Sequence, residues 1–367
     1  MYMCTWKEDS PLYIACKGGY TDIVTKLVDN KADINMCTGG KSPLYIACKG
    51  GYTDIVTKLV DNKADINKCT GMGESPLYIA CKGGYTDIVT KLVDNKADIN
   101  MCTLRGESPL YIACKGEYTD IVTKLVDNKA DINMWTCGES PLFIACKGGY
   151  TDIVTKLVDS KADINKCTGW GESPLCIACR GGYTDIVTKL VDNKADINMW
   201  TWWGESPLYI ACKGGYTDIV TKLVDNKADI NMCTWWGESP LYIACMRGYT
   251  DIVTKLVDNK ADINKRTDDG ESPLFIACKG GYTDIVTKLV DSKADINKCT
   301  GWGESPLHTA CKGGYTDIVT KLVDSKADIY KCTRWGESPL YIAFEGRYTD
   351  IVTKLMDNKA DINKCTE

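Results

Sequence analysis

Proton-transfer and nucleophilic chemistry need a base beside an acid or a nucleophile, and the chain offers a single histidine, His308. No nucleophile or second base is specified around it, so a hydrogen-bonding core residue is the favoured interpretation. The aspartates and glutamates recur in one repeated pattern, which is typical of solvated faces and helix starts rather than of one active-site pair. No phosphate-binding loop, dinucleotide fingerprint or zinc-protease pair occurs. The sequence therefore predicts no enzymatic activity, no catalytic residue and no cofactor.

The 21 cysteines could form disulfides or bind metal ions, but their spacing is regular. Ten recur in the dipeptide Ala-Cys, nine lie in segments that precede a Ser-Pro-Leu tripeptide, Cys365 lies in the corresponding segment after the last repeat, and Cys176 stands alone. A tetrahedral zinc site needs four ligands around one point, which an evenly spaced row does not supply. Equivalent residues of stacked helices lie about 8 to 10 Å apart, beyond the roughly 7 Å Cα limit for a disulfide. We therefore expect reduced thiols and no metal site.

All ten tryptophans lie in the same segments that precede Ser-Pro-Leu. Tryptophan is costly to leave in water and is enriched at binding hot spots, so partner binding is the favoured interpretation. The alternative is that the rings stack on one another as a stiffening ladder. Three successive segments hold six of them, Trp170, Trp200, Trp202, Trp203, Trp235 and Trp236. The candidate partner-binding residues are Trp135, Trp170, Trp200, Trp202, Trp203, Trp235, Trp236, Trp302 and Trp335.

The elements that must position these residues follow from the prolines, because all eleven occur in the tripeptide Ser-Pro-Leu. Eight of their ten spacings are 33 residues and two are 32. A fixed period in this range is typical of stacked-repeat architectures, in which each unit buries its apolar face against its neighbours. The prolines are Pro11, Pro43, Pro76, Pro109, Pro141, Pro174, Pro207, Pro240, Pro273, Pro306 and Pro339.

One unit, Glu74 to Thr103, illustrates the pair of helices that the pattern predicts. Ser75 can cap a first helix that the following proline opens and a glycine pair ends. Thr86 is a plausible cap for a second helix, whose apolar residues fall on one face. Within that helix Asp87 precedes Lys91 by four residues, a spacing that favours an ion pair. Helices this short cannot bury their faces alone, so neighbouring units must stack.

These residues resemble the ankyrin repeat. The family phrase Thr-Pro-Leu-His-x-Ala appears as Ser-Pro-Leu-Tyr-Ile-Ala in most units and as Ser-Pro-Leu-His-Thr-Ala around His308. The resemblance implies an all-α repeat solenoid of helix-turn-helix units with β-hairpin-like finger loops, in which partners lie against the fingers and the concave face of first helices. We expect residues 1–367 to form a single array of eleven repeats that begins and ends within finger loops and has no specialised caps.

Two departures from the family pattern carry consequences. The histidine after Pro-Leu is tyrosine in most units, and we expect packing to replace its hydrogen bonds. The glycine that usually ends the second helix is lysine in every unit. If lysine adopts the left-handed conformation, each one costs about 1 kcal/mol. The alternative is that the preceding residue, usually asparagine, adopts the left-handed conformation instead. These lysines are Lys31, Lys63, Lys96, Lys129, Lys161, Lys194, Lys227, Lys260, Lys293, Lys326 and Lys359.

Charge and hydropathy exclude several classes of partner. The formal net charge of −5 arises from 49 acidic and 44 basic residues that are evenly scattered, so no basic tract exists to bind nucleic acid. The apolar runs are far shorter than the roughly 20 residues that span a bilayer, and the first ten residues lack the apolar core of a secretory peptide. A row of basic residues that ends the first helices, with glutamates nearby, is best explained as a solvated face.

We therefore expect a cytoplasmic, monomeric, non-enzymatic interaction module or scaffold that holds a protein partner across the tryptophan-rich fingers and the concave helix face. The alternative is a recognition or structural segment of a larger ankyrin protein, such as a membrane-cytoskeleton scaffold, a ligase adaptor or a channel, whose effector domain lies outside these residues. A mechanical role, with the stack acting as a spring, is a third and weaker hypothesis. The sequence does not identify the partner.

Overall fold

The computed structural model describes residues 9–136 and 138–361, and these hold twenty-two α-helices and no strand. Two isolated antiparallel bridges, Thr38 with Lys41 and Thr136 with Glu139, lie in the loops between repeats. The chain divides into unit 1, Met1–Ile177, and unit 2, Ala178–Glu367, and each is considered by itself. The predicted all-α repeat solenoid of helix pairs is confirmed.

Each repeat consists of a first helix, a tight turn, a second helix and a finger loop. The first helices are α1 (Pro11–Gly18), α3 (Pro43–Gly50), α5 (Pro76–Gly83), α7 (Pro109–Lys115), α9 (Pro141–Gly148), α11 (Pro174–Gly181), α13 (Pro207–Gly214), α15 (Pro240–Arg247), α17 (Pro273–Gly280), α19 (Pro306–Gly313) and α21 (Pro339–Glu345). The second helices are α2 (Thr21–Asp29), α4 (Thr53–Asp61), α6 (Thr86–Asp94), α8 (Thr119–Asp127), α10 (Thr151–Asp159), α12 (Thr184–Asp192), α14 (Thr217–Asp225), α16 (Thr250–Asp258), α18 (Thr283–Asp291), α20 (Thr316–Asp324) and α22 (Thr349–Asp357).

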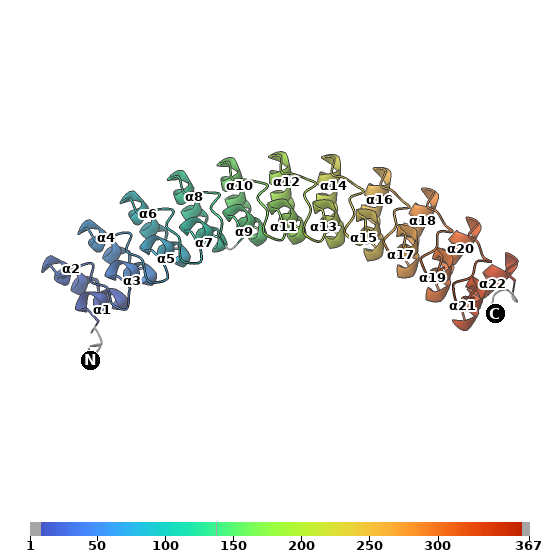
Figure 1. The fold of residues 1–367 in the computed structure, drawn as a ribbon, viewed down its shortest axis with the longest axis horizontal. Helices are drawn as coiled ribbons and strands as arrows, with labels where there is room; N and C mark the ends of the chain where they lie inside the picture. The colour runs from blue at the N-terminus through green and yellow to red at the C-terminus, as the bar shows by residue number, and fades with distance from the viewer. Residues whose placement is uncertain (1–8, 137, 362–367) are drawn as a thin grey trace. The chain divides into compact units, whose positions relative to one another are not determined.

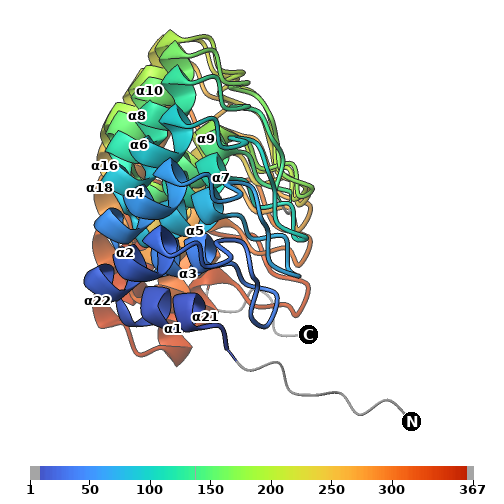
Figure 2. The ribbon, with the colours of Figure 1, turned by 90° about the vertical axis from the view of Figure 1, so that its left-hand side faces the viewer.

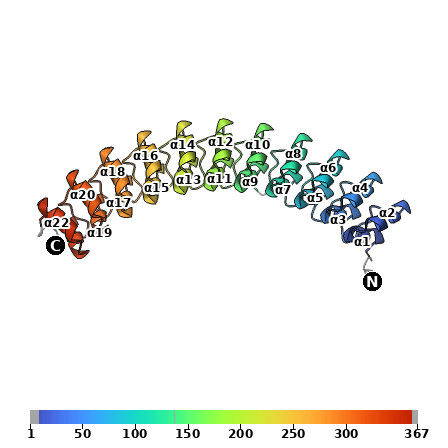
Figure 3. The same ribbon diagram turned by 180° about the vertical axis from the view of Figure 1, so that it is seen from behind.

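The helices of each unit form two rows. In unit 1 the helices α1 to α9 with odd numbers make one row and α2 to α10 with even numbers the other (Figure 1). Figure 2 shows that the first helices of unit 1 lie between the second helices and the finger loops. Unit 2 has the same two rows, which are seen from behind in Figure 3. The finger loops therefore extend from the side of the first helices.

The first helix starts and stops as its sequence predicts. The hydroxyl of Ser75 accepts a hydrogen bond of 3.0 Å from the Tyr78 N–H, and Pro76 occupies the first helical position. Gly84 ends α5 with a φ of 74°, and its N–H donates to the carbonyls of Ala80 and Cys81. A side chain at Gly84 would meet the ring of Tyr118 as well as the unfavourable φ, so both conformation and space favour glycine there. Glu117 and Arg347 nevertheless take the equivalent position in two other repeats, with φ of 63° and 59°.

The second helix differs from the sequence prediction in two details. Thr86 is its first helical residue and not its cap, because the cap position belongs to Tyr85, whose side chain makes no capping bond. Lys91 does not pair with Asp87 but reaches the carboxylate of Asp61 in the preceding repeat, at 2.7 Å. Both charges of this pair are partly solvated, so it contributes about 0 to 1 kcal/mol while joining adjacent second helices.

The core is continuous between neighbouring repeats within each unit. Ile88 and Leu92 of α6, like Ala80 of α5, have no exposed surface, because the repeats on both sides cover them. Burying a side chain such as Ile88 or Leu92 contributes roughly 1.5 to 3 kcal/mol. The first described repeat shows the effect of a missing neighbour, since Ile23 is 50% exposed and its equivalent Ile55 is 0% exposed. Stacking, rather than any single repeat, therefore buries the apolar faces.

The turn after the second helix is carried by lysine. Lys96 has a φ of 65°, whereas the preceding Asn95 has a φ of −94°. The Lys96 N–H donates to the carbonyl of Val93 at 3.0 Å and the Ala97 N–H to that of Leu92 at 3.0 Å, which is the bonding of a helix end closed by a left-handed residue. Of the two possibilities that the sequence leaves open, the left-handed lysine is the one observed.

Candidate functional site

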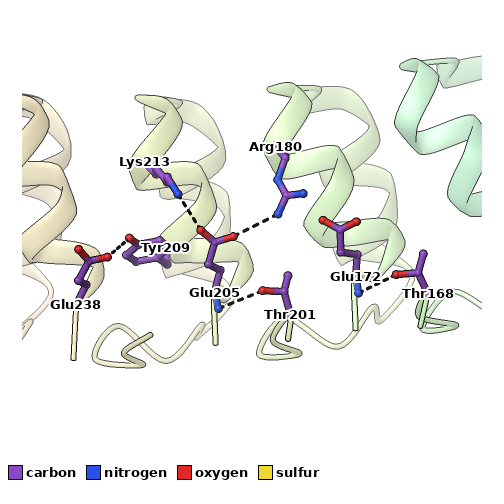
Figure 4. A network of polar contacts seen from close by, with 8 residues as sticks. All are labelled: Thr168, Glu172, Arg180, Thr201, Glu205, Tyr209, Lys213 and Glu238. Atoms are coloured by element: carbon purple, nitrogen blue, oxygen red, sulfur yellow. Dashed lines mark hydrogen bonds and ion pairs between the residues drawn. The ribbon is translucent and has the colours of Figure 1, made fainter. Parts of the chain in front are cut away.

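Each described finger is a tight loop held by a threonine at its base, which is buried in some fingers and half-buried in others. In unit 2 the Thr201 N–H donates to the carbonyl of Glu205 at 3.0 Å, and the Glu205 N–H donates to the Thr201 hydroxyl at 3.3 Å. Thr201 is 1% exposed, and Gly204 adopts a φ of 74° between these residues. The equivalent bond from Glu172 to Thr168, 3.2 Å long, repeats the arrangement in unit 1 (Figure 4). The threonine thus fixes the base of the loop and leaves its tip exposed.

The fingers of unit 2 lie in register with one another. We call the two residues at the tip of each finger the tip pair. Adjacent fingers are joined by one backbone hydrogen bond, in which the first residue of a tip pair donates its N–H to the carbonyl of the second residue of the preceding tip pair. These bonds run from Trp235 to Trp203 (3.5 Å), from Asp268 to Trp236 (3.0 Å), from Gly301 to Asp269 (3.3 Å) and from Arg334 to Trp302 (3.1 Å). The tip pairs are residues 202–203, 235–236, 268–269, 301–302 and 334–335.

The tryptophans of the described residues all lie in fingers, outside the helices, and are 44% to 71% exposed. Trp135 and Trp170 belong to unit 1, and Lys166 places its ammonium 4.8 Å from the centre of the Trp135 ring. Trp6 lies outside the described residues. The other candidate binding residues belong to unit 2 and are Trp200, Trp202, Trp203, Trp235, Trp236, Trp302 and Trp335.

The structure brings some of the unit 2 tryptophans together. Trp203 stacks on Trp236 with ring centres 5.9 Å apart, and Trp302 stacks on Trp335 at 5.7 Å. Trp200 and Trp235 line a shallow pocket of about 390 Å³ between two fingers, together with Gly204, Met232, Cys233 and Thr234. Because stacked Trp203 and Trp236 are still each 54% exposed, stacking leaves more than half of each residue's surface available to a partner.

A polar network runs beside the fingers along the first helices (Figure 4). The Glu205 carboxylate accepts hydrogen bonds from the Lys213 ammonium at 2.8 Å and from the Arg180 guanidinium at 3.3 Å. The Tyr209 hydroxyl donates a hydrogen bond to the Glu238 carboxylate of the next repeat. Burial, followed by the bond to Glu238, raises the pKa of Tyr209, so its hydroxyl remains a donor at neutral pH. Arg180, Glu205, Tyr209, Lys213 and Glu238 are thus each engaged with a neighbour, which fits a solvated polar rim.

The tyrosines correct one expectation in five repeats, where a hydrogen bond and not packing alone takes the place of that of the family histidine. The hydroxyl instead donates to a glutamate of the next repeat, as from Tyr78 to Glu107 at 2.6 Å. The signal available in the sequence was the constant spacing of 28 or 29 residues between each tyrosine and that glutamate. The tyrosines with this bond are Tyr45, Tyr78, Tyr111, Tyr209 and Tyr242.

His308 is a buried structural residue rather than an exposed base. Its Nδ1 atom lies 2.7 Å from the hydroxyl of Ser305, which caps α19, and the side chain is 1% exposed. Its Nε2 atom is buried without a partner in hydrogen-bonding geometry among the described residues. Burial lowers the pKa of His308 to about 4, with a smaller opposing effect from the nearby backbone of Glu337 and Lys331. The imidazole is therefore neutral at physiological pH.

The cysteines of the first helices are buried between repeats, where burial raises the pKa of Cys16 to about 12. Such thiols remain protonated and unreactive at neutral pH. Cys332 is disulfide-bonded, so the expectation of reduced thiols throughout is wrong in that finger. The expectation used the spacing of stacked helices, whereas neighbouring fingers approach to backbone hydrogen-bonding distance. Cys4, Cys137 and Cys365 lie outside the described residues, within which no group of three metal-binding side chains occurs.

Helix pairs in stacked rows, with loops in register beside them, define this chain as a stacked-repeat protein. A family model of three ankyrin repeats matches residues 2–69, 62–136, 142–234, 208–300 and 274–365, and a second ankyrin-repeat model matches residues 118–158. The chain belongs to the ankyrin-repeat family.

The solved structures include a similar fold, the crystal structure of the human ASB11 ankyrin repeat domain. The two share 26% sequence identity with a TM-score of 0.54, over 59% of this chain and 98% of that chain. No curated protein sequence matches the chain. Ankyrin repeats generally mediate protein–protein interactions and are typically non-enzymatic. None of the helices in residues 9–136 and 138–361 is long and apolar enough to cross a membrane.

Proposed function

We propose that residues 1–367 act as one array of eleven ankyrin repeats, a monomeric cytoplasmic scaffold that captures a protein partner on its tryptophan-bearing fingers and the adjoining first-helix face. The observation that carries the proposal is the exposure of the finger tryptophans, from 44% to 71%, on loops whose backbones are held in place. Contiguous exposed aromatic surface with a polar rim is typical of an interaction site.

The contrast between helices and fingers supports this assignment. The helices repeat almost unchanged, and their apolar side chains are used in stacking, whereas the tip pairs differ from finger to finger. The threonine at the base of a finger keeps the backbone fixed while the tip residues vary. A fixed frame with variable tips suits recognition of one particular partner, since little ordering entropy is lost when the partner binds.

The experiment that tests the proposal replaces Trp202, Trp203, Trp235 and Trp236 by alanine. We expect the affinity for a partner isolated by pull-down to fall by about 2 kcal/mol or more, roughly thirtyfold, because exposed tryptophans of this kind act as hot spots. Helical content, measured by circular dichroism, should be unchanged since none of the four lies in a helix.

The matched control replaces Met356 of the second helix α22, an apolar side chain that is 46% exposed and lies outside the fingers and the first helices, by alanine, and it should leave partner affinity unchanged. The same quadruple variant is also unfolded in urea. If its midpoint drops while partner affinity stays intact, the tryptophans serve only as a stiffening ladder, and the assignment of the fingers as the binding site is wrong.

A further inference from the structure

Sulfur atoms of neighbouring fingers meet in pairs in unit 1. The Cys69 thiol donates to the thioether sulfur of Met101 at 2.9 Å, and the Cys102 thiol donates to that of Met134 at 3.0 Å. We call Cys69 with Met101, and Cys102 with Met134, the sulfur pairs. All four side chains are half-buried, so solvent reaches both pairs. Each sulfur pair thus brings two soft donor atoms from different fingers to one point.

The backbone holds the two fingers of a sulfur pair together. The Leu104 N–H donates to the carbonyl of Met72 at 2.9 Å, which joins the finger of Cys69 to the finger of Met101. Thr103, at the base of the second finger, is 9% exposed, and its carbonyl accepts from the Gly106 N–H at 2.8 Å. The two sulfur atoms are therefore placed by a backbone that is already ordered.

An equivalent cysteine in unit 2 has a different neighbour. In both sulfur pairs the methionine stands 32 residues after the cysteine. The same spacing leads from Cys233 to Lys265, so the sequence puts an ammonium where the sulfur pairs have a thioether. Burial raises the pKa of the Cys233 thiol, and the Lys265 ammonium lowers it by a smaller amount, which places that charge near the thiol. The chain thus contains its own comparison, a finger thiol beside a cation instead of a second sulfur.

The charges around the sulfur pairs favour a cation. Burial raises the pKa of the Cys69 thiol, and the carboxylates of Asp65 and Asp98 raise it further. Burial raises the pKa of the Cys102 thiol in the same way, followed by the carboxylates of Asp98 and Asp131. The free thiols are therefore protonated at neutral pH. The carboxylates that disfavour a bare thiolate stabilise a positive ion beside it.

We propose that each sulfur pair binds one soft monovalent metal ion, with copper(I) as the biological example. Thiolate and thioether sulfurs are ligands that select copper(I), whereas harder ions such as Mg²⁺ prefer oxygen. Two ligands are too few for the four-coordinate sites that zinc prefers. The thiol S–H bond breaks and its proton passes to solvent, while the thiolate and the thioether each donate an electron pair to the ion. The thiolate balances the single charge of the ion, and no oxidant or reductant is needed.

Binding requires the two sulfur atoms of a pair to separate. With metal–sulfur distances of about 2.3 Å, as in zinc–thiolate bonds, an ion between them needs a sulfur–sulfur distance of up to about 4.6 Å. The methionine supplies this movement, because its unbranched side chain has three rotatable bonds and is only half-buried. The finger backbones keep their places while the thioether swings.

The test titrates the full chain, with isotope-labelled methionine methyl groups, under anaerobic conditions with copper(I) supplied as its bicinchoninate complex. Binding is read from the methyl signals in the nuclear magnetic resonance spectrum. We expect the signals of Met101 and Met134 to move, with one proton released per bound ion. The same concentration of Zn²⁺ should leave both signals in place, because a thioether adds little to zinc binding.

Substitution of each thiol identifies its own methionine. Cys69→Ser should stop the Met101 signal from moving while the Met134 signal still responds, and Cys102→Ser should give the reverse. The double variant Met101→Leu/Met134→Leu, which nearly preserves side-chain volume, should hold copper(I) at these thiols at least about tenfold more weakly against bicinchoninate, the least that loss of a supporting residue around a metal costs.

Two further variants serve as control and as gain of function. Met232→Leu changes a finger methionine that lines a pocket with Trp200, and it should leave copper(I) affinity unchanged. Lys265→Met replaces the ammonium near Cys233 by a thioether and should add a methyl signal that copper(I) moves.

Signals of Met101 and Met134 that stay in place while the chain takes copper(I) from bicinchoninate would show that exposed thiols alone bind the ion, and would overturn the proposal. It is equally overturned if the chain takes up no copper(I), or if the Met101 signal still moves in the Cys69→Ser variant. None of these variants changes a finger tryptophan, so their outcome is independent of the test of partner capture.

Discussion

Replacing all eleven lysines that end the second helices by glycine should raise the free energy of unfolding by about 5 to 10 kcal/mol. Each of these lysines has a φ between 63° and 72°, where the Cβ atom crowds the backbone. Relief of that strain is worth about 1 to 2 kcal/mol per site, and the greater freedom of glycine in the unfolded chain offsets about 0.4 to 1 kcal/mol of it. The sites lie in different repeats, so their effects should nearly add.

The matched control is the corresponding set of lysine-to-alanine substitutions. Alanine removes the same charge and the same long side chain but keeps the Cβ atom, so it should not stabilise the chain. Stability is measured as the midpoint and slope of urea unfolding for each variant. If the alanine variant gains as much unfolding free energy as the glycine variant, repulsion among the lysines, and not backbone strain, limits the stability of the chain.

Much of the fold is predictable because local signals agree with the global arrangement. The Ser-Pro start, the glycine end and the apolar spacing of a unit such as Glu74 to Thr103 each point to the same pair of helices, and the bounds of α5 and α6 follow them. The cap of the second helix is the exception. Thr86 has the side chain of a cap, but the turn that begins at Gly84 places Tyr85 in the cap position.

Contacts between repeats were less accessible to sequence reasoning. Lys91 has a suitable partner within its own helix, Asp87, yet it bonds to Asp61, because stacking places that carboxylate beside it. In the same way the Tyr78 hydroxyl finds Glu107 in the next repeat. Such pairs depend on how adjacent repeats are offset from one another, and the local sequence pattern of a single repeat does not predict that offset.

The candidate site shows the same contrast between features that the local sequence predicts and features that depend on stacking. That the tryptophans gather in fingers follows from the sequence, and their exposure agrees with that placement. Which rings stack depends on the register of the finger backbones, as in the bond from Asp268 to Trp236. The stacked pairs Trp203–Trp236 and Trp302–Trp335 therefore depend on contacts between repeats, which the sequence of a single finger does not specify.

The stability of the repeat around His308 should fall by about 2 to 3 kcal/mol when the pH is lowered from 7.5 to 4.5. The folded pKa of about 4 is lower than the ordinary value of 6.5, because burial disfavours the imidazolium. Above pH 6.5 both folded and unfolded forms are neutral and stability is complete. As the pH falls toward 4, the unfolded chain takes up a proton that the folded chain does not, so stability is lost. His308 is the single histidine, and nuclear magnetic resonance can therefore follow its titration directly.

The matched variant is His308→Tyr, which introduces the residue that most other repeats carry at this position. Glu337 lies 29 residues further on, the spacing of the tyrosine–glutamate bonds elsewhere in the chain, so the new hydroxyl should find an acceptor. Because every aspartate and glutamate is common to the two proteins, their acid titration largely cancels in the difference between the two urea-unfolding curves. That difference should grow by about 2 to 3 kcal/mol in favour of the tyrosine variant between pH 7.5 and 4.5. A constant difference, together with a histidine that titrates near 6.5, would mean that the imidazole gains its proton without leaving the folded core.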